Sequence, residues 1–222
     1  MNNSISGFEY PLYLLEVFGI LSGIFNDSSD KKSYLVGGCV RDILLNKCPK
    51  DFDIVTNIPI ESVITEFSNN GWKVSEAGKQ FLVCIISKNG NSIEIANFRN
   101  DLTYIDGRRP EGVEIGTIEE DANRRDITIN ALYLDPYTSE ILDPTNNGLS
   151  DLTNKIIRMN GKADDRIKED LLRIMRVYRF AANLKFEIDK KTLIACRKHF
   201  NEMMIKIPGE RVKNEIEKMI GL

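Results

Sequence analysis

The chain has 222 residues, of which 42% are hydrophobic and 28% charged, and its net charge is -3. This length and hydrophobic share are enough for one sizeable core or two small ones, and they exclude a disordered or collagen-like chain. Residues 1–150 carry 13 Lys and Arg against 22 Asp and Glu, whereas residues 151–222 carry 17 against 11. The basic part is either a surface for polyphosphate or nucleic acid, or a set of solvated helix faces.

The first apolar run, residues 10–25, contains Pro11 and Glu16, and no basic segment precedes it. Its helical period predicts a helix packed behind a sheet, and its composition argues against a signal peptide or a membrane span. The chain has four cysteines without a C-x-x-C pair, and one histidine. We therefore expect reduced, mostly buried thiols, no zinc site and a cytoplasmic protein without a membrane partner.

Residues 34–56, YLVGGCVRDILLNKCPKDFDIVT, are expected to form a strand, a glycine turn, a helix and a second strand. Gly37 and Gly38 lack a Cβ, so the backbone can turn there through conformations closed to other residues and let a phosphate approach closely. Asp51 and Asp53 flank Phe52 at the entry to the second strand. Because side chains alternate along a strand, both carboxylates are expected on one face and Phe52 on the other.

This Asp-x-Asp pattern indicates a metal clamp. Magnesium prefers oxygen ligands, and polymerase-type nucleotide transfer uses two divalent cations about 4 Å apart. Isolated Asp-x-Asp pairs are more often ordinary turn and surface charges. The Gly-Gly turn just before the pair favours the metal site here.

The segments that follow predict a small mixed sheet of five strands with helices beside it. Residues 60–69 have a helical period, and residues 72–74, 81–87 and 92–98 are β-rich. Asn89-Gly90-Asn91 is a strong hairpin signal between the last two runs.

Residues 100–116 combine Asp-Gly, Pro and Gly without an apolar period, which predicts a mobile loop. Two adjacent arginines in this loop, Arg108 and Arg109, are either a phosphate contact or plain surface charge. Residues 119–134 begin acidic and continue as a helix or a strand. The polar side of this segment carries Arg124, Arg125, Asp126 and Asn130.

A turn-rich segment, residues 143–148, predicts a hinge between two domains, residues 1–148 and residues 149–222. The second domain has a short β-like run at 156–159 and is expected to be helical from Asp165 onward. The predicted helices span 165–182, 189–200 and 209–220.

One of these helices carries a second group of polar residues. Asp170, Arg173, Arg176 and Arg179 are spaced three apart, so on a helix they form a row opposite an apolar side. Such a row can donate hydrogen bonds to phosphates and to the edge of a base. Taken in isolation, such a row is more often an Asp-Arg ladder that stabilises a solvated face.

Together these patterns resemble the class II tRNA nucleotidyltransferase and bacterial poly(A) polymerase family, which belongs to the polymerase-beta-like superfamily. The resemblance is clear from Tyr34 to about Leu184 and weak beyond, through residues 209–212. The matching residues are Gly37-Gly38-Cys39-Val40-Arg41-Asp42, Asp51-Phe52-Asp53-Ile54-Val55-Thr56, Arg124-Arg125-Asp126-Ile127-Thr128-Ile129-Asn130-Ala131, and Glu169-Asp170 with Arg173, Arg176 and Arg179.

The resemblance implies a role for each matched position. The positions that would bind the triphosphate are Gly38 and Arg41, with Arg176 and Arg179 holding phosphate. Catalysis and the binding of two Mg²⁺ ions would fall to Asp51 and Asp53. Arg125 would contact the nucleotide, and Asp126 and Asn130 would lie near its ribose. Base selection, first CTP and then ATP, would fall to Asp170 and Arg173. The family's flexible loop matches Asp106, Arg108 and Arg109.

The implied fold is α+β, with a nucleotidyltransferase head followed by an all-helical neck. The implied activity is template-independent addition of CCA, or part of it, to tRNA 3′ ends. Addition of AMP to RNA as a poly(A) polymerase uses the same motifs, and a non-catalytic RNA-binding module that kept the fold is a third alternative. Family members usually continue with body and tail domains, so we expect either a minimal form or a homodimer or partner chain that supplies the missing tRNA grip.

Overall fold

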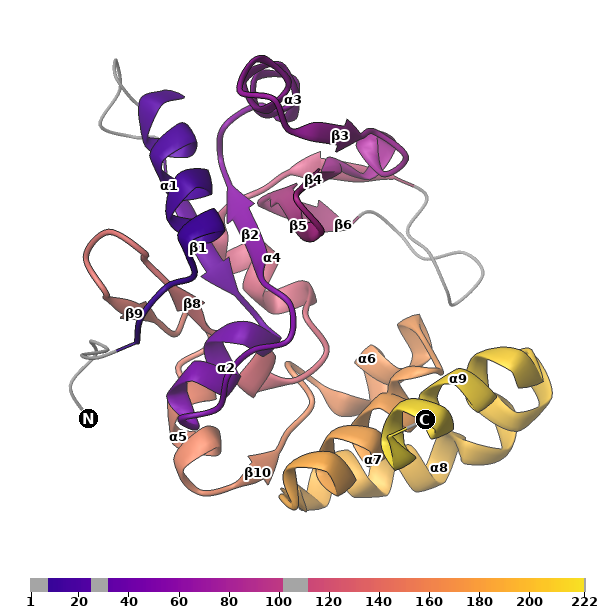
Figure 1. The fold of residues 1–222 in the computed structure, drawn as a ribbon. Helices are drawn as coiled ribbons and strands as arrows, with labels where there is room; N and C mark the ends of the chain where they lie inside the picture. Colours follow the sequence, from indigo (N-terminus) through magenta and orange to yellow (C-terminus); the bar gives the residue numbers. More distant parts are fainter. Residues whose placement is uncertain (1–7, 25–31, 102–111, 222) are drawn as a thin grey trace.

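The computed structural model describes residues 8–24, 32–101 and 112–221. Within these residues the centre of the fold is a mixed sheet of seven strands, in the order β3-β4-β5-β2-β1-β8-β9 (Figure 1). The strands are β1 (Ser33–Val36), β2 (Asp53–Thr56), β3 (Lys73–Ser75), β4 (Val83–Lys88), β5 (Asn91–Asn97), β8 (Tyr133–Leu134) and β9 (Ile141–Leu142). Only β2 and β5 pair in parallel; the other neighbours are antiparallel. The predicted mixed sheet is confirmed, but the expected number of five strands is wrong, because β8 and β9 are too short to show a pattern.

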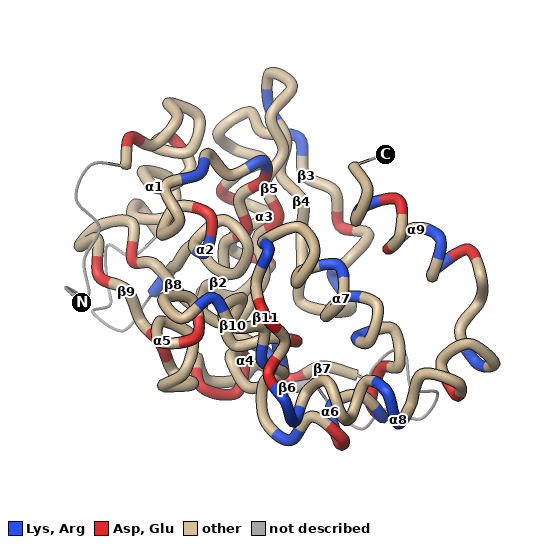
Figure 2. The backbone as a smooth tube through the Cα atoms, turned by 90° about the horizontal axis from the view of Figure 1, so that it is seen from below, with Lys and Arg blue, Asp and Glu red and all other residues tan. Residues whose placement is uncertain are grey.

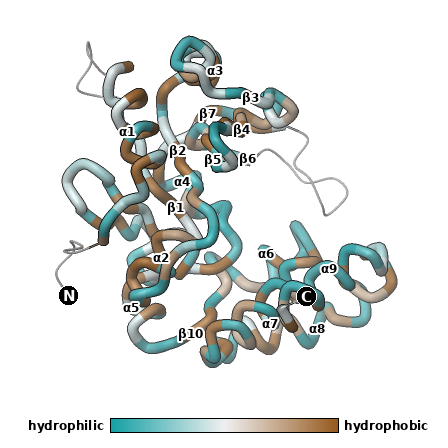
Figure 3. Tube along the Cα trace, in the orientation of Figure 1, coloured by the Kyte–Doolittle hydropathy of each residue, from teal (hydrophilic) through white to brown (hydrophobic). Residues whose placement is uncertain are grey.

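The alternation of side chains along the strands divides the sheet into two packed faces. On one face Leu35 and Ile54 join the large hydrophobic cluster, which also contains side chains of α1, α2 and α3. On the other face Val36 and Val55 join a smaller cluster that contains Ala122 of α4. Figure 3 shows the strands β1 and β2 among the hydrophobic segments of the chain.

Three helices of the large cluster agree closely with the sequence pattern. They are α1 (Leu12–Ile24), α2 (Gly38–Leu44) and α3 (Ile60–Asn69). Asn89 and Gly90, both with positive φ, form the predicted turn between β4 and β5. A single turn of 3-10 helix, Lys79–Phe81, precedes β4.

The prediction of a loop over 100–116 is wrong at both ends, because β6 (Arg99–Asp101) pairs with β7 (Val113–Ile115) inside this range. Asp106, Arg108 and Arg109 lie outside the described residues. The segment expected to be one helix or strand is three elements: α4 (Ile118–Arg124), a 3-10 turn (Thr128–Asn130) and β8. α4 begins at a capping box in which Thr117 and Glu120 satisfy each other's backbone N–H groups.

The remainder is mostly helical, as predicted. Its elements are α5 (Gly148–Thr153), β10 (Ile156–Ile157), α6 (Ala163–Glu169), α7 (Arg173–Leu184), β11 (Glu187–Ile188), α8 (Lys190–Lys206) and α9 (Gly209–Ile220). Two expectations were wrong here. β11 interrupts the helical region by pairing in parallel with β10, and the helix predicted over 165–182 is two helices.

The break between α6 and α7 has a local cause at Asp170. Its backbone is extended, with φ -147° and ψ 105°, and its carboxylate accepts a hydrogen bond from the N–H of Leu172 at 3.0 Å. A side chain that binds the backbone two residues ahead competes with helical hydrogen bonding. Asp170 therefore lies in the turn before α7, not in the helical row that the sequence suggested.

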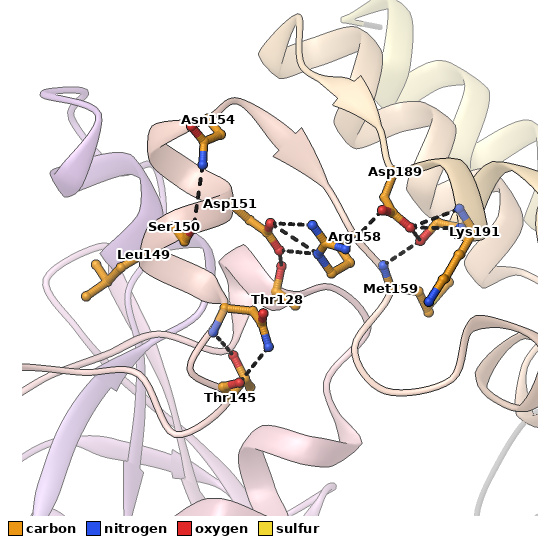
Figure 4. Close-up of polar contacts among 12 residues, drawn as sticks. Thr128, Thr145, Leu149, Ser150, Asp151, Asn154, Arg158, Met159, Asp189 and Lys191 are labelled. Carbon is orange, nitrogen blue, oxygen red and sulfur yellow. Dashed lines mark hydrogen bonds and ion pairs between the residues drawn. The ribbon is translucent and has the colours of Figure 1, made fainter.

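The segment expected to be a hinge is closely packed. A Cβ on Gly148 would lie 2.8 Å from the carbonyl oxygen of Thr128, so only glycine fits this approach of α5 to the 3-10 turn. Buried Asp151 of α5 accepts from the Thr128 hydroxyl at 2.6 Å and pairs with Arg158, which also binds Asp189 at the start of α8 (Figure 4). This network joins elements on both sides of residue 148, and the division of the chain there stays a prediction.

The cysteines of the chain are free thiols, and Cys39, Cys84 and Cys196 are buried whereas Cys48 is exposed. Across the described ranges we find no helix with the length and apolar character needed to cross a membrane.

Candidate active site

A cavity of about 790 Å³ lies between the β2–β5 side of the sheet and the start of α7. Charged side chains from both sides line it. Those predicted from the sequence are Asp53, Arg125, Asp126, Asp170, Arg173 and Arg176, together with Gly38 and Asn130. The structure therefore brings together residues as far apart in the chain as Gly38 and Arg176, which are separated by 138 positions. Asp51, Arg41 and Arg179 are not among the lining residues.

The glycine turn at one end of the cavity depends on Gly37, which is buried and has a φ of +80°. A Cβ there would lie 3.5 Å from Nη1 of Arg125, so the turn and this arginine approach closely. Gly38 begins α2, and a Cβ on it would lie 3.6 Å from Nη2 of Arg41. The Arg41 guanidinium is thus beside the turn, where it donates to Asn130 Oδ1 at 2.7 Å and to Asp42 at 2.8 Å.

The predicted carboxylates lie where β2 begins. Phe52 is buried in the core, while Asp51 and Asp53 are exposed. Asp53 pairs in register with Glu94 of β5, so two acidic side chains from adjacent strands share the cavity. Loss of hydration in the cavity, and then repulsion from Glu94, raise the pKa of Asp53 to about 6.

Sequence reasoning missed Glu94. The alternation in Ser92-Ile93-Glu94-Ile95 signals an outward-facing acid on a strand, but only the parallel pairing places it beside Asp53. In the described part of the chain no three His, Cys, Asp or Glu side chains are gathered closely enough to form a ready metal site. The chemistry of Asp51, Asp53 and Glu94 nevertheless fits magnesium, because all three supply carboxylate oxygens, and Glu94 and Asp51 add to the negative charge around Asp53.

The raised pKa of Asp53 predicts an unusual pH dependence in the metal-free protein. The folded state keeps this proton up to about pH 6, whereas an unperturbed Asp loses it near 3.8. Since the folded state binds more protons in this window, the contribution of Asp53 to stability falls as pH rises from about 4 to about 6. Urea unfolding without metal should show Asp53→Asn gaining stability relative to the parent across this window. Parallel stability curves for the two proteins would contradict the assignment.

A buried charge cluster holds Arg125 at the wall of the cavity. Asp121 is fully buried and accepts from Arg125 Nη2 at 2.9 Å, from Arg124 Nε at 2.9 Å and from the Tyr133 hydroxyl at 2.6 Å. Arg125 also lies over the Tyr133 ring, 5.5 Å from its centroid. Burial alone would raise the pKa of Asp121, but the two guanidinium groups outweigh it and lower the pKa. The spacing Asp121-x-x-Arg124-Arg125 signals such helical ion pairs, yet the sequence reading did not single out Asp121.

Asp126 joins the sheet side of the cavity to α7. Its buried carboxylate accepts hydrogen bonds from Arg176 Nε at 2.8 Å and from the backbone N–H of Ile127 at 2.9 Å. Asn130 donates to the same carboxylate at 3.4 Å. Burial raises the pKa of Asp126, and the Arg176 guanidinium more than reverses that shift. Two residues that the sequence placed in separate motifs are therefore one ion pair.

The sequence predicted Arg173 on a row that faces solvent or a ligand. In the structure this residue is buried, with only 6% of its surface exposed. Its Nη1 donates to Glu169 at 2.7 Å and to the carbonyl of Arg166 at 2.6 Å. Val177 and Phe180 on the expected polar side are also buried. α7 therefore has buried residues on its polar side as well as on its apolar side.

Asp170 faces the cavity beside Arg173, and burial raises its pKa. The hydrogen bond from Leu172 opposes that shift, as does the charge of Arg211 at the start of α9. Arg211 was noted in the sequence only as part of a weak match. Arg179 points elsewhere: it pairs with buried Glu215 of α9 at 2.6 Å and so fastens α9 to α7. Basic positions recur along α7 and α8 (Figure 2).

This arrangement combines carboxylates on one wall with arginines on the others. Carboxylates at a strand edge suit divalent cations, and guanidinium groups suit phosphate oxygens and base edges. A ligand that carries both a metal-bound polyphosphate and a hydrogen-bonding ring matches such a cavity.

Comparison with known proteins agrees with this chemistry. Residues 33–158 match the family described as poly A polymerase head domain. A CCA-adding enzyme of Streptococcus pyogenes serotype M5 (strain Manfredo) is 40% identical over 190 residues, which cover 85% of this chain and 46% of that protein. The chain spans about half the length of such relatives.

Solved structures with the same fold include proteins in complex with nucleotides. The Bacillus stearothermophilus CCA-adding enzyme in complex with CTP has a TM-score of 0.80 and 31% identity, over 96% of this chain and 49% of that one. A tRNA nucleotidyltransferase complexed with a primer tRNA and an incoming ATP analog has a TM-score of 0.72 and 29% identity, over 89% and 55% of the two chains. The core fold described above is therefore a nucleotidyltransferase head fold.

Proposed function

The chain belongs to the poly A polymerase head domain family, and from this premise we propose that it adds CCA, or part of it, to tRNA 3′ ends without a nucleic-acid template, using CTP and ATP. One observation carries the proposal. The cavity places the Asp53 and Glu94 carboxylates on one wall and the side chains of Asp170 and Arg173 on another. A nucleoside triphosphate has a metal-binding triphosphate at one end and a base at the other. The carboxylates would face the metal-bound triphosphate, and Asp170 and Arg173 would face the base.

Asp51 and Asp53, with Glu94 beside them, would hold two magnesium ions. When bound, these ions would activate the terminal hydroxyl of the RNA and neutralise charge on the triphosphate. The cluster of carboxylates supports this role, because Asp53 and Glu94 repel each other and divalent cations held between them would relieve that repulsion.

The triphosphate would lie against the glycine turn. Gly37 and Gly38 leave room for it, and Arg41 beside the turn would donate to its oxygens in exchange for part of its contact with Asp42. Arg125 is held by Asp121 and keeps Nη1 near Gly37, which orients it towards the same place. Pyrophosphate would leave from this arginine-rich end after in-line attack on the α-phosphate.

Asp126 and Asn130 would lie near the ribose, as the resemblance implies. In the protein without nucleotide they are engaged with Arg176 and Arg41 respectively. We propose that they orient these arginines as well as limiting the space for the sugar.

Base selection would fall to Asp170 and Arg173, whose side chains offer acceptors and donors at the cavity wall. Arg173→Ala is expected to relax the choice among nucleotides more than it slows turnover. The removed contact is of the kind worth about 1 to 3 kcal/mol of discrimination, which is roughly 5- to 150-fold. The measurement is incorporation of each of the four nucleotides by the variant and the parent. Unchanged exclusion of GTP and UTP would assign base selection to another residue.

The deciding experiment offers the protein tRNA lacking its CCA end with each labelled nucleotide in turn. Sequential incorporation of CMP and then AMP supports CCA addition. CMP alone or AMP alone indicates a partial activity, repeated AMP on any RNA indicates a poly(A) polymerase, and no incorporation with retained RNA binding indicates a non-catalytic module. The RNA partner would contact the cavity through its 3′ end.

A further inference from the structure

The ring of Phe180 is surrounded by arginines. Phe180 lies in α7, is 8% exposed and belongs to the large hydrophobic cluster. The guanidinium carbon of Arg179 lies 4.3 Å from its centroid, that of Arg176 lies 5.5 Å away, and that of Arg41 lies 5.6 Å away. Arg41 belongs to α2, which packs on the sheet, whereas Arg176 and Arg179 belong to α7. The ring of Phe180 therefore contacts arginines from two separate elements.

Each of these arginines has its own anionic partner away from the ring. Arg41 pairs with Asp42 at 2.8 Å, Arg176 with Asp126 at 2.6 Å and Arg179 with Glu215 at 2.6 Å. The partners belong to different elements, so the ion pairs do not link the guanidinium groups to one another. A chain of hydrogen bonds joins Arg41 to Arg176, since Arg41 donates to Asn130, Asn130 donates to Asp126, and Asp126 pairs with Arg176. The Phe180 ring adds a direct contact with all three guanidinium groups, because its negative face attracts cations.

The energetic consequence concerns like charges. Three guanidinium groups gathered at one place repel one another, and their gathering is favourable only with counter-charges or an aromatic face between them. Long arginine side chains also lose rotamer freedom when held. A ring that holds them in advance reduces that loss when an anion arrives.

We propose that Phe180 is a positioning residue for polyphosphate binding: its ring fixes Arg41 relative to Arg176, so that guanidinium groups from α2 and α7 bind the triphosphate tail of the nucleotide together. Arg179 stacks on the same ring and fixes it through Glu215 to α9. This inference rests on the proposed nucleotide site. In it, Phe180 contributes to binding of the phosphates and not to binding of the base.

The test measures binding of CTP, ATP and inorganic tripolyphosphate, each with Mg²⁺, by calorimetry. Phe180→Leu keeps an apolar side chain and removes the aromatic face, Phe180→Met does the same with a more adaptable shape, and Phe180→Tyr restores the ring. Phe186→Leu is the matched control, because Phe186 has the same 8% exposure in the same cluster and no arginine over its ring in the described part of the chain. Unfolding midpoints are recorded for every variant.

We expect both ring-free variants to bind all three ligands about tenfold more weakly, which is the size expected when two partly exposed cation–π contacts are lost. Phe180→Tyr should bind within about twofold of the parent. Phe186→Leu should lower the unfolding midpoint by as much as Phe180→Leu while leaving ligand binding unchanged.

The possible failures are distinguishable. If the parent binds CTP, ATP and tripolyphosphate, and a folded Phe180→Leu or Phe180→Met binds tripolyphosphate equally well, the inference is wrong and the proposed function stands. A loss confined to CTP and ATP also overturns it, because the ring would then act on the base end. If the parent binds none of the three, the proposed function fails and this inference fails with it.

Discussion

Asp53→Ala is expected to reduce nucleotide transfer by at least about 10³-fold while the protein stays folded. Metal-assisted stabilisation of the transition state supplies several kcal/mol, and each 1.36 kcal/mol is a factor of ten in rate. The structure explains why folding should survive. Asp53 is exposed to the cavity and is repelled by Glu94. Removing its charge therefore relieves electrostatic repulsion between the two carboxylates in the metal-free protein. Asp51→Ala should have the same effect on transfer.

The measurement is single-turnover incorporation at saturating nucleotide and RNA, with circular dichroism as the check on folding. Asp165→Ala is a suitable control, because Asp165 is exposed on α6 and does not line the cavity. Retained activity in either site variant at ordinary magnesium concentrations would remove the basis for assigning metal binding to these residues.

Asp121→Asn is expected to have the largest effect on stability, a loss of about 3 to 5 kcal/mol in the free energy of unfolding. This is the usual cost of removing one partner from a buried ion pair, because the other charge is left without compensation. Here Asp121 is fully buried, and Arg124 and Arg125 both depend on it. The variant should also bind nucleotide weakly, since Arg125 is no longer held at the cavity wall.

Urea unfolding of Asp121→Asn is best compared with that of Tyr133→Phe. The second variant removes only the hydroxyl that donates to Asp121, and its expected cost is about 1 kcal/mol. If Asp121→Asn loses no more than Tyr133→Phe, the carboxylate is not needed to compensate the arginines and the description of this cluster as a positioning device is wrong.

α7 illustrates where local pattern was sufficient and where it failed. A period of 3.6 residues correctly predicted a helix there, and it correctly placed Ile174 and Met175 inside. It placed Arg173 on the solvent-exposed side, because an argument from periodicity assumes that one side of a helix is buried and the other is exposed. Contacts of α7 with both α8 and α9, and with Arg41 from α2, bury most of its circumference. Which side of a helix is covered depends on neighbours that the local sequence does not contain.

The acidic residues of the site show the same limit. Asp51 and Asp53 were recognisable because they stand next to a glycine turn in a short stretch of chain. Glu94 stands 41 residues after Asp53, and only the parallel pairing of β2 with β5 brings the two together. Asp121 was visible as one acid in an acidic run, but its complete burial between two arginines could not be foreseen from spacing alone.

The sequence by itself determined the boundaries of α3 and α9, the hairpin turn at Asn89-Gly90, the mixed sheet and the family to which the chain belongs. These features depend on contacts between residues close in sequence, or on short motifs with few alternatives. The tertiary structure decided the pairing of Asp126 with Arg176, the break at Asp170 and the gathering of three arginines around Phe180. Such features arise from residues far apart in the chain, whose charges and burial are set only when the sheet and the helices pack against each other.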